Sequence, residues 1–147
     1  MLMLTLRPIT AENLESVLAL KVSPAQKSYV STVAASLAQA WVYRDTAFPF
    51  AVYAGDEPVG FVMLGYYAPR QQYTLWKFLI DAAHQHRGYG RQALQLAIRW
   101  LQEVKGANEV YTGVLLGNEN AKRLYLSEGF APTGLVENNM EELRLRC

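Results

Sequence analysis

The stretch Gln85-His86-Arg87-Gly88-Tyr89-Gly90 decides the fold, because it separates an apolar segment from the clearest helical pattern in the chain. From Arg91 to Lys105, apolar residues recur on one helical face, and Gly106 is placed to end the helix. The first turn of a helix presents unpaired amides and a partial positive charge, and glycines let backbone approach an anion closely. The sequence therefore predicts a diphosphate-binding loop here, to which Arg87 or Arg91 adds positive charge.

Two glycines before a helix also occur in ordinary turns, so the loop alone does not identify a ligand. The stretch lacks the third glycine of the dinucleotide fingerprint and the Gly-Lys-Ser/Thr of a P-loop. Nicotinamide cofactors and nucleoside triphosphates are therefore disfavoured.

On both sides of this loop, the hydrophobic periodicity predicts further strands and helices. Before it, we expect strands at residues 2–7, 50–54, 59–67 and 73–80, the last three as a meander. We also expect a helix capped by Thr10, and a second that begins at Ser23-Pro24, runs to Trp41 and breaks near residues 30–33. After it, we expect a strand at 110–116, a helix from Asn118 to Gly129, and short strands near Phe130 and at 140–145.

Length and composition limit the class of protein. The 147 residues fit one domain, residues 1–147, and 51% hydrophobic against 18% charged residues predicts a folded chain. The net charge of +1 disfavours nucleic-acid binding. The lone Cys147 allows no intrachain disulfide, and no stretch of about 18 apolar residues occurs. We expect a cytoplasmic protein without a membrane span, and the sequence leaves a homodimer open.

A second pattern lies downstream, in the stretch Asn118-Glu119-Asn120-Ala121-Lys122-Arg123-Leu124-Tyr125-Leu126-Ser127-Glu128-Gly129-Phe130. Physical reasoning alone makes Asn118 a helix cap, with Ala121, Leu124 and Tyr125 on the inward face. Two stretches resemble the two motifs of the GCN5-related N-acetyltransferases (GNAT). One is Gln85-x-x-Gly88-x-Gly90 before a helix, and the other is this order of Asn, Ala, Leu-Tyr and Gly-Phe. The resemblance covers the whole order of elements, and residues 50–130 carry the specific matches.

The resemblance implies an α/β (α+β) GNAT fold, whose central mixed, mostly antiparallel sheet has a splayed central strand and flanking helices. It implies acetyl-CoA as cosubstrate, without a metal, and transfer of the acetyl group to a primary amine. The coenzyme-binding residues that it implies are Phe78, Leu79, Ile80, Gln85, His86, Arg87, Gly88, Tyr89, Gly90, Arg91, Asn118, Ala121 and Tyr125. At residues 78–80 the backbone is expected to bind, and Tyr125 is expected to protonate the leaving thiolate.

Direct attack requires a neutral amine, and an amine with a pKa near 10 is only about 0.1% neutral at pH 7. A general base is therefore expected. Asp81 follows the strand at 73–80 and is the base that we name, although a carboxylate there is equally suited to cap a loop. Glu137 and Glu142, acting through water, are the alternatives.

The acceptor is the least determined part of the prediction. Residues 21–41 resemble the N-terminal helices of bacterial spermine/spermidine (diamine) acetyltransferases, which implies a small polyamine acceptor. Residues 31–33 depart from that family's pattern, and Trp76 stands where some polyamine enzymes have an acidic residue. A protein N-terminal or lysine amine, another small amine such as an amino sugar, and a non-catalytic acetyl-CoA-binding module are the alternatives.

Two further patterns have a plain structural explanation. His84 and His86 lack the cysteine or carboxylate cluster that would complete a metal site, so we expect none. Tyr66, Tyr67, Tyr73 and Trp76 are expected to pack between strands, and some of them to form a wall of the acceptor pocket. Asp45, Asp81, Glu137, Glu141 and Glu142 are the carboxylates that we consider for a polycation.

Overall fold

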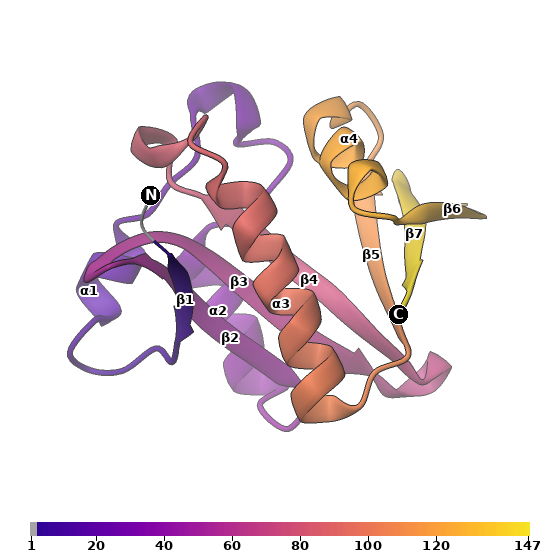
Figure 1. Ribbon diagram of the computed structural model, residues 1–147, viewed down its shortest axis with the longest axis horizontal. Helices are drawn as coiled ribbons and strands as arrows, with labels where there is room; N and C mark the ends of the chain where they lie inside the picture. Colours follow the sequence, from indigo (N-terminus) through magenta and orange to yellow (C-terminus); the bar gives the residue numbers. More distant parts are fainter. Residues whose placement is uncertain (1–2) are drawn as a thin grey trace.

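The computed structural model describes residues 3–147 (Figure 1). Seven strands form one sheet in the order β1-β2-β3-β4-β5-β7-β6, with β4 and β5 parallel and all other neighbours antiparallel. The strands are β1 (Leu4–Arg7), β2 (Ala47–Ala54), β3 (Glu57–Tyr67), β4 (Gln72–Ile80), β5 (Glu109–Leu115), β6 (Ala131–Glu137) and β7 (Met140–Arg146). The predicted mixed, mostly antiparallel sheet is confirmed.

Helices cover both faces of the sheet. The α-helices are α1 (Leu14–Leu18), α2 (Val33–Val42), α3 (Tyr89–Lys105) and α4 (Glu119–Ser127), and the short 3-10 helices are η1 (Pro24–Gln26), η2 (Ala68–Arg70) and η3 (Ala82–His84). Helix α3 buries Ala93, Leu94, Ala97 and Leu101 against one face. Helices α1 and α2 lie behind the sheet in Figure 1, where Val17 and Val33 pack with Phe61 and Met63.

The parallel pair β4 and β5 is joined over a very short length. Only Thr74 with Tyr111 and Leu75 with Thr112 are in register, whereas β4 continues to Ile80 and β5 to Leu115. On the other side of β4, Met63 pairs with Lys77 and Leu64 with Leu75, so Trp76 is an extra residue, a β-bulge. Since a bulge bends its strand and increases the local twist, it accounts for the divergence of β4 from β5 at this point. The predicted splayed central strand is thereby confirmed as β4.

Most predicted elements are present, with shifted ends. Leu2, part of the predicted first strand, lies outside the described residues. Strand β2 begins at Ala47 instead of residue 50, because Pro49 lies within a strand whose pairing with β3 continues past it. The prediction that Thr10 caps α1 is wrong: the cap position is Asn13, whose Oδ1 accepts a hydrogen bond from the amide of Thr10 at 2.8 Å.

The second predicted helix is divided further than its sequence pattern indicates. Ser23-Pro24 begins only the single 3-10 turn η1, and α2 starts afresh at Val33. The hydroxyl of Thr32 accepts a hydrogen bond from the amide of Ala35 at 3.1 Å and so caps α2. The expected break near residues 30–33 is confirmed, and residues 21–31 cross the end of β4 with none of their side chains fully buried. Among residues 3–147, no helix is long and apolar enough to span a membrane.

Candidate active site

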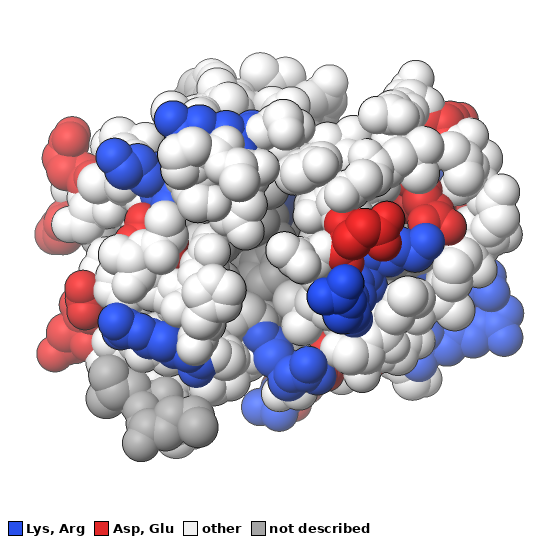
Figure 2. Space-filling view, turned by 90° about the horizontal axis from the view of Figure 1, so that it is seen from above, with Lys and Arg blue, Asp and Glu red and all other residues white. Residues whose placement is uncertain are grey.

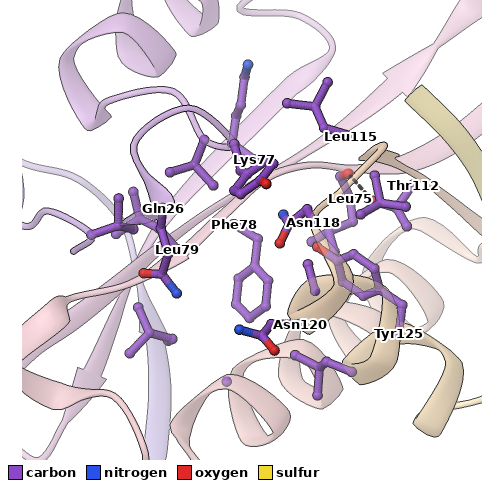
Figure 3. Close-up of a pocket in the computed structure, with 18 of the residues that line it drawn as sticks. Gln26, Leu75, Lys77, Phe78, Leu79, Thr112, Leu115, Asn118, Asn120 and Tyr125 are labelled. Carbon is purple, nitrogen blue, oxygen red and sulfur yellow. Dashed lines mark hydrogen bonds between the residues drawn. The ribbon is translucent and has the colours of Figure 1, made fainter. Parts of the chain in front are cut away.

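A cavity of about 830 Å³ lies where β4 and β5 diverge; we call it the first cavity. Its walls come from residues 22–31, β4, the loop before α3, β5 and α4, and Figure 3 shows side chains of these segments around a common space. Of the residues predicted to bind the coenzyme, those that line it are Phe78, Leu79, Ile80, Gln85, His86, Gly88, Tyr89, Gly90, Arg91, Asn118, Ala121 and Tyr125. Arg87 is outside this lining.

The loop before α3 has the backbone of an anion-binding turn. Gly88 is the N-cap of α3, at φ 78°, and His86 also has a positive φ of 65°. No side chain caps the first turn, whose leading amides have no partner within the helix. Successive amides in such a conformation form a concave nest, and the 17-residue helix adds the partial positive charge of its N-terminus. The loop therefore suits a diphosphate through its backbone.

Two side chains that flank this turn, Gln85 and Arg91, are engaged in other contacts. The Nε2 of Gln85 donates to the Oε1 of Gln26 and to the carbonyl of Ile80, each at 2.9 Å. Gln85 thus joins η1 to the end of β4. The guanidinium of Arg91 pairs with Glu128, at the end of α4.

Asp81 holds the loop after β4. Its Oδ1 accepts a hydrogen bond from the amide of Lys21 at 3.0 Å, and its Oδ2 lies 3.1 Å from the Nδ1 of His84. The Nε2 of His84 lies 3.1 Å from Glu57. Asp81 is not in the lining of the first cavity, so its contacts match the loop-capping alternative more closely than the role of a base.

Tyr125 is buried in α4 at the inner end of the first cavity. Burial raises the pKa of Tyr125 to about 12, against a smaller opposing effect of the Thr112 hydroxyl. Thr112 is itself buried, and its Oγ1 donates to the carbonyl of Leu75 at 3.0 Å (Figure 3). The phenol therefore keeps its proton at neutral pH.

Asn118 occupies the N-cap position of α4, but its side chain makes no capping hydrogen bond. The predicted position of the cap is therefore confirmed, and the side chain of Asn118 does not bond the first-turn amides. With ψ at 70°, the residue lies outside the extended conformation in which a cap oxygen reaches the first-turn amides. Figure 3 shows its amide directed into the first cavity.

A second cavity of about 560 Å³ lies on the other side of the point where β4 and β5 part. The two cavities share five lining residues: Leu75, Trp76, Thr112, Gly113 and Met140. Five of the residues that line the second cavity are aromatic: Tyr43, Tyr66, Tyr67, Trp76 and Tyr111. Of the predicted aromatic group, Tyr66, Tyr67 and Trp76 line it, and Tyr73 packs against the ring of Tyr66 instead.

Glu137 and Glu142 bring carboxylates to the second cavity. The Oε1 of Glu142 accepts a hydrogen bond from the hydroxyl of Thr133 at 2.9 Å, and its Oε2 lies 3.3 Å from Arg70. The remaining carboxylates considered for a polycation are not in this lining: Glu141 pairs with Lys122 at 2.7 Å, and Asp45 is exposed. Tertiary structure thus brings together two of the five.

Among the lining residues that the sequence did not predict are Lys77 and Thr112. Lys77 donates to the hydroxyl of Ser31 at 2.8 Å, and burial lowers the pKa of its amine. Thr112 lies within a predicted strand and has no other distinguishing feature there. The only sequence signal for Lys77 is that a single lysine interrupts a predicted strand. No local signal marks Thr112.

The side of the molecule at the top of Figure 1 is hollowed near its middle. Figure 2 shows this hollow bordered by separate groups of both charge signs. Among the described residues 3–147, no group of three or more His, Cys, Asp or Glu side chains is arranged to hold a metal ion. The two cavities offer to a reaction backbone amides, the Tyr125 phenol and carboxylates, together with the Lys77 amine and the imidazoles of His84 and His86.

The known proteins that this chain resembles include acetyltransferases. The model of the acetyltransferase (GNAT) family matches residues 14–130. The chain is 28% identical to the spermine/spermidine N(1)-acetyltransferase of Bacillus subtilis, over 97% of each chain. It resembles an acetyltransferase from Thermus thermophilus, at 26% identity and a TM-score of 0.78 over 99% of this chain and 98% of that one. It shares the fold of the spermidine N-acetyltransferase from Vibrio cholerae solved with CoA and spermine, at 19% identity and a TM-score of 0.76 over 97% and 95%.

Proposed function

Because the chain belongs to the acetyltransferase (GNAT) family and is an acetyl-CoA-dependent N-acetyltransferase, we propose that its acceptor is a polyamine such as spermine or spermidine. We take residues 1–147 as one domain that performs the whole reaction. The polyamine acceptor named for the Bacillus subtilis relative supports this choice. The observation that carries it is the second cavity, which joins aromatic faces to the carboxylates of Glu137 and Glu142.

In this proposal the coenzyme occupies the first cavity. Its diphosphate binds the backbone amides of residues 86–91, and its pantetheine arm follows the exposed backbone of Phe78, Leu79 and Ile80 beside Asn118 and Ala121. The part of β4 beyond Leu75 has no partner in β5, so the backbone groups on that side are available to a ligand, apart from the Ile80 carbonyl that accepts from Gln85. Backbone amides are pre-oriented donors for a developing oxyanion, and losing one such donor typically costs about 100-fold to 1000-fold in rate.

The acceptor occupies the second cavity, and its amine reaches the thioester where the two cavities meet. Ammonium groups are attracted to aromatic faces at about 0.5 to 2 kcal/mol each, more strongly where water is excluded. A carboxylate contact adds on the order of 1.5 to 3 kcal/mol. A chain with several regularly spaced amines can use both kinds of contact at once, whereas a monoamine cannot.

The reaction needs a base at one end and an acid at the other. Supplying the neutral amine at pH 7 costs roughly 4 kcal/mol unless a base accepts the proton. Glu137 and Glu142 line the acceptor cavity and are the bases that we favour, acting through water, over Asp81, whose oxygens are engaged by Lys21 and His84. After attack on the thioester carbonyl, the carbon–sulfur bond breaks, and the Tyr125 phenol gives its proton to the thiolate.

The test is steady-state thiol release from acetyl-CoA with spermine, spermidine, a monoamine, a lysine-bearing peptide and an amino sugar, each at low and moderate salt. We expect the highest kcat/KM with the polyamines, and a KM for spermine that rises with salt more than that for the monoamine, because salt screens exposed charge pairs. If the peptide or the amino sugar exceeds both polyamines in kcat/KM, the acceptor proposal is wrong and the acetyltransferase activity stands.

A further inference from the structure

A positive side chain stands at the rim of the cavity that we assign to a cation. Arg70 ends η2, the turn between β3 and β4, and its Nη1 lies 3.3 Å from the Oε2 of Glu142 on β7. Tyr67 and Gln72, on either side of this turn, both line the second cavity, as Glu142 does. Arg70 is not itself in this lining, and its guanidinium reaches the lining carboxylate of Glu142 from the turn between Tyr67 and Gln72.

The two oxygens of Glu142 are held in different ways. Its Oε1 accepts from the hydroxyl of Thr133, a neutral partner on the adjacent strand β6. Its Oε2 faces the charged partner Arg70. The Glu142 side chain is only 16% exposed, whereas that of Arg70 is 45% exposed. Thr133 can hold the carboxylate in place without Arg70.

The contact with Arg70 is of a kind that a ligand can displace. It is a single contact rather than a bidentate pair, and the arginine is half in solvent. Such pairs contribute about 0 to 1 kcal/mol, because solvent screens the attraction and the long side chain loses entropy. An ammonium group entering the cavity competes for the same oxygen.

We propose that Arg70 is a specificity-determining residue, an internal cation that occupies Glu142 in the free enzyme and sets how much positive charge an acceptor must carry to replace it. This inference rests on the proposed function, since it concerns the acceptor bound in the second cavity. Arg70 lowers the affinity of every cationic acceptor by repulsion. The penalty grows with the number of ammonium groups that lie near the rim.

The proposal predicts a gain of affinity on removal of a charge. Arg70→Gln should lower the KM for spermine by about threefold to tenfold, because one repulsive charge is removed and Glu142 keeps its bond to Thr133. The KM for a monoamine such as propylamine should fall less. The KM for acetyl-CoA should not change, since Arg70 is not among the residues that line the first cavity.

Two control variants separate this effect from a general change in charge or stability. Arg70→Lys keeps the positive charge and should keep the parent KM for spermine. Arg7→Gln removes a comparably exposed arginine whose partner, Asp56 at 3.4 Å, lines neither cavity, so this variant should also match the parent. Thermal unfolding of all three variants shows whether each is folded.

The outcomes distinguish this inference from the proposed function. A lower spermine KM for Arg70→Gln, with both controls unchanged, supports both. If the parent acetylates polyamines best and Arg70→Gln has the same or a higher KM for spermine, the role of Arg70 is refuted and the polyamine acceptor stands. If neither the parent nor Arg70→Gln acetylates or binds spermine, the acceptor proposal fails and the inference fails with it.

Discussion

The hydroxyl of Thr112 donates a hydrogen bond to the carbonyl of Leu75, across 3.0 Å, at the last residue pair that joins β4 to β5. Beyond this pair the strands diverge, and both cavities include Leu75 and Thr112 in their walls. The bond thus closes the ladder at the point where the proposed coenzyme and acceptor sites meet. Substitutions at this bond and in the first cavity beside it have distinct expected effects.

Thr112→Val should destabilise the fold. The substitution keeps the shape of the side chain but leaves the Leu75 carbonyl without its partner in a buried position, which costs about 1 to 3 kcal/mol. Thr112→Ser retains the hydroxyl and should lose less. Urea denaturation measures the free energies of unfolding of the parent and both variants, and a Thr112→Val variant as stable as the parent would show that the bond contributes nothing.

Gly88→Ala should weaken coenzyme binding. At φ 78° a side chain strains the backbone, by about 1 kcal/mol or more, and a Cβ at this position meets no protein atom within 4 Å. Any relaxation of the strained turn moves the amides that we assign to the diphosphate. Calorimetric titration with CoA should show affinity reduced about tenfold or more.

The matched control for this change is Gly106→Ala, at the other end of α3. Gly106 has a similar φ of 70°, and a Cβ there also meets nothing within 4 Å. Both variants should lose similar stability, and only Gly88→Ala should bind CoA more weakly. Parallel losses of affinity in the two variants would contradict the assignment of the diphosphate to this loop.

Tyr125→Phe should reduce turnover without reducing coenzyme affinity. The variant keeps the packing of the ring against Phe130 but removes the proton that we assign to the thiolate, and general acids contribute about 100-fold to 10,000-fold in rate. Tyr53→Phe, a buried tyrosine that lines neither cavity, is the control. An unchanged kcat for Tyr125→Phe, under conditions where chemistry limits the rate, would make Tyr125 a packing residue.

Burial of Tyr125 also predicts a pH dependence of stability. The folded chain holds the phenolic proton up to a pKa of about 12, whereas the unfolded chain releases it near pH 10. The folded state therefore binds more protons between these values, and its stability falls as pH rises through this window. Relative to pH 8, the parent should lose about 1 kcal/mol more than Tyr125→Phe by pH 11.

Urea unfolding at pH 8 to 11 measures this difference. Tyr67→Phe, in which an exposed phenol is removed, is the reference variant and should follow the parent. Parallel pH curves for the parent and Tyr125→Phe would refute the raised pKa in the folded state.

Patterns within a single segment were sufficient for most of the fold. The glycine loop before α3, the amphipathic pattern of residues 91–105 and the alternation of the meander all act over a few turns or a few residue pairs, so the sequence alone specified them. The order of Asn118, Ala121 and Tyr125 on α4 is likewise local, which is why these residues indicate the family without reference to their tertiary contacts.

Helix capping was decided less clearly by local sequence. Thr10 and Asn13 both have side chains that cap helices, and Ser23-Pro24 has the pattern of a longer helix than the single turn η1. At η1, contacts with distant residues oppose a longer helix: Asp81 binds the amide of Lys21, and Gln85 binds Gln26. Such contacts compete with local propensity at a cost of only about 1 kcal/mol per residue.

Only the tertiary structure decided which charged residues share a site. Glu137 and Glu142 meet at the second cavity, whereas Asp81 and Glu141 are engaged by His84 and Lys122. Arg70 and Glu142 are 72 residues apart in sequence, and Thr112 and Leu75 are 37 apart. No periodicity encodes these pairs, because they depend on how the bulge at Trp76 turns β4 away from β5 and on the register in which β7 joins the sheet.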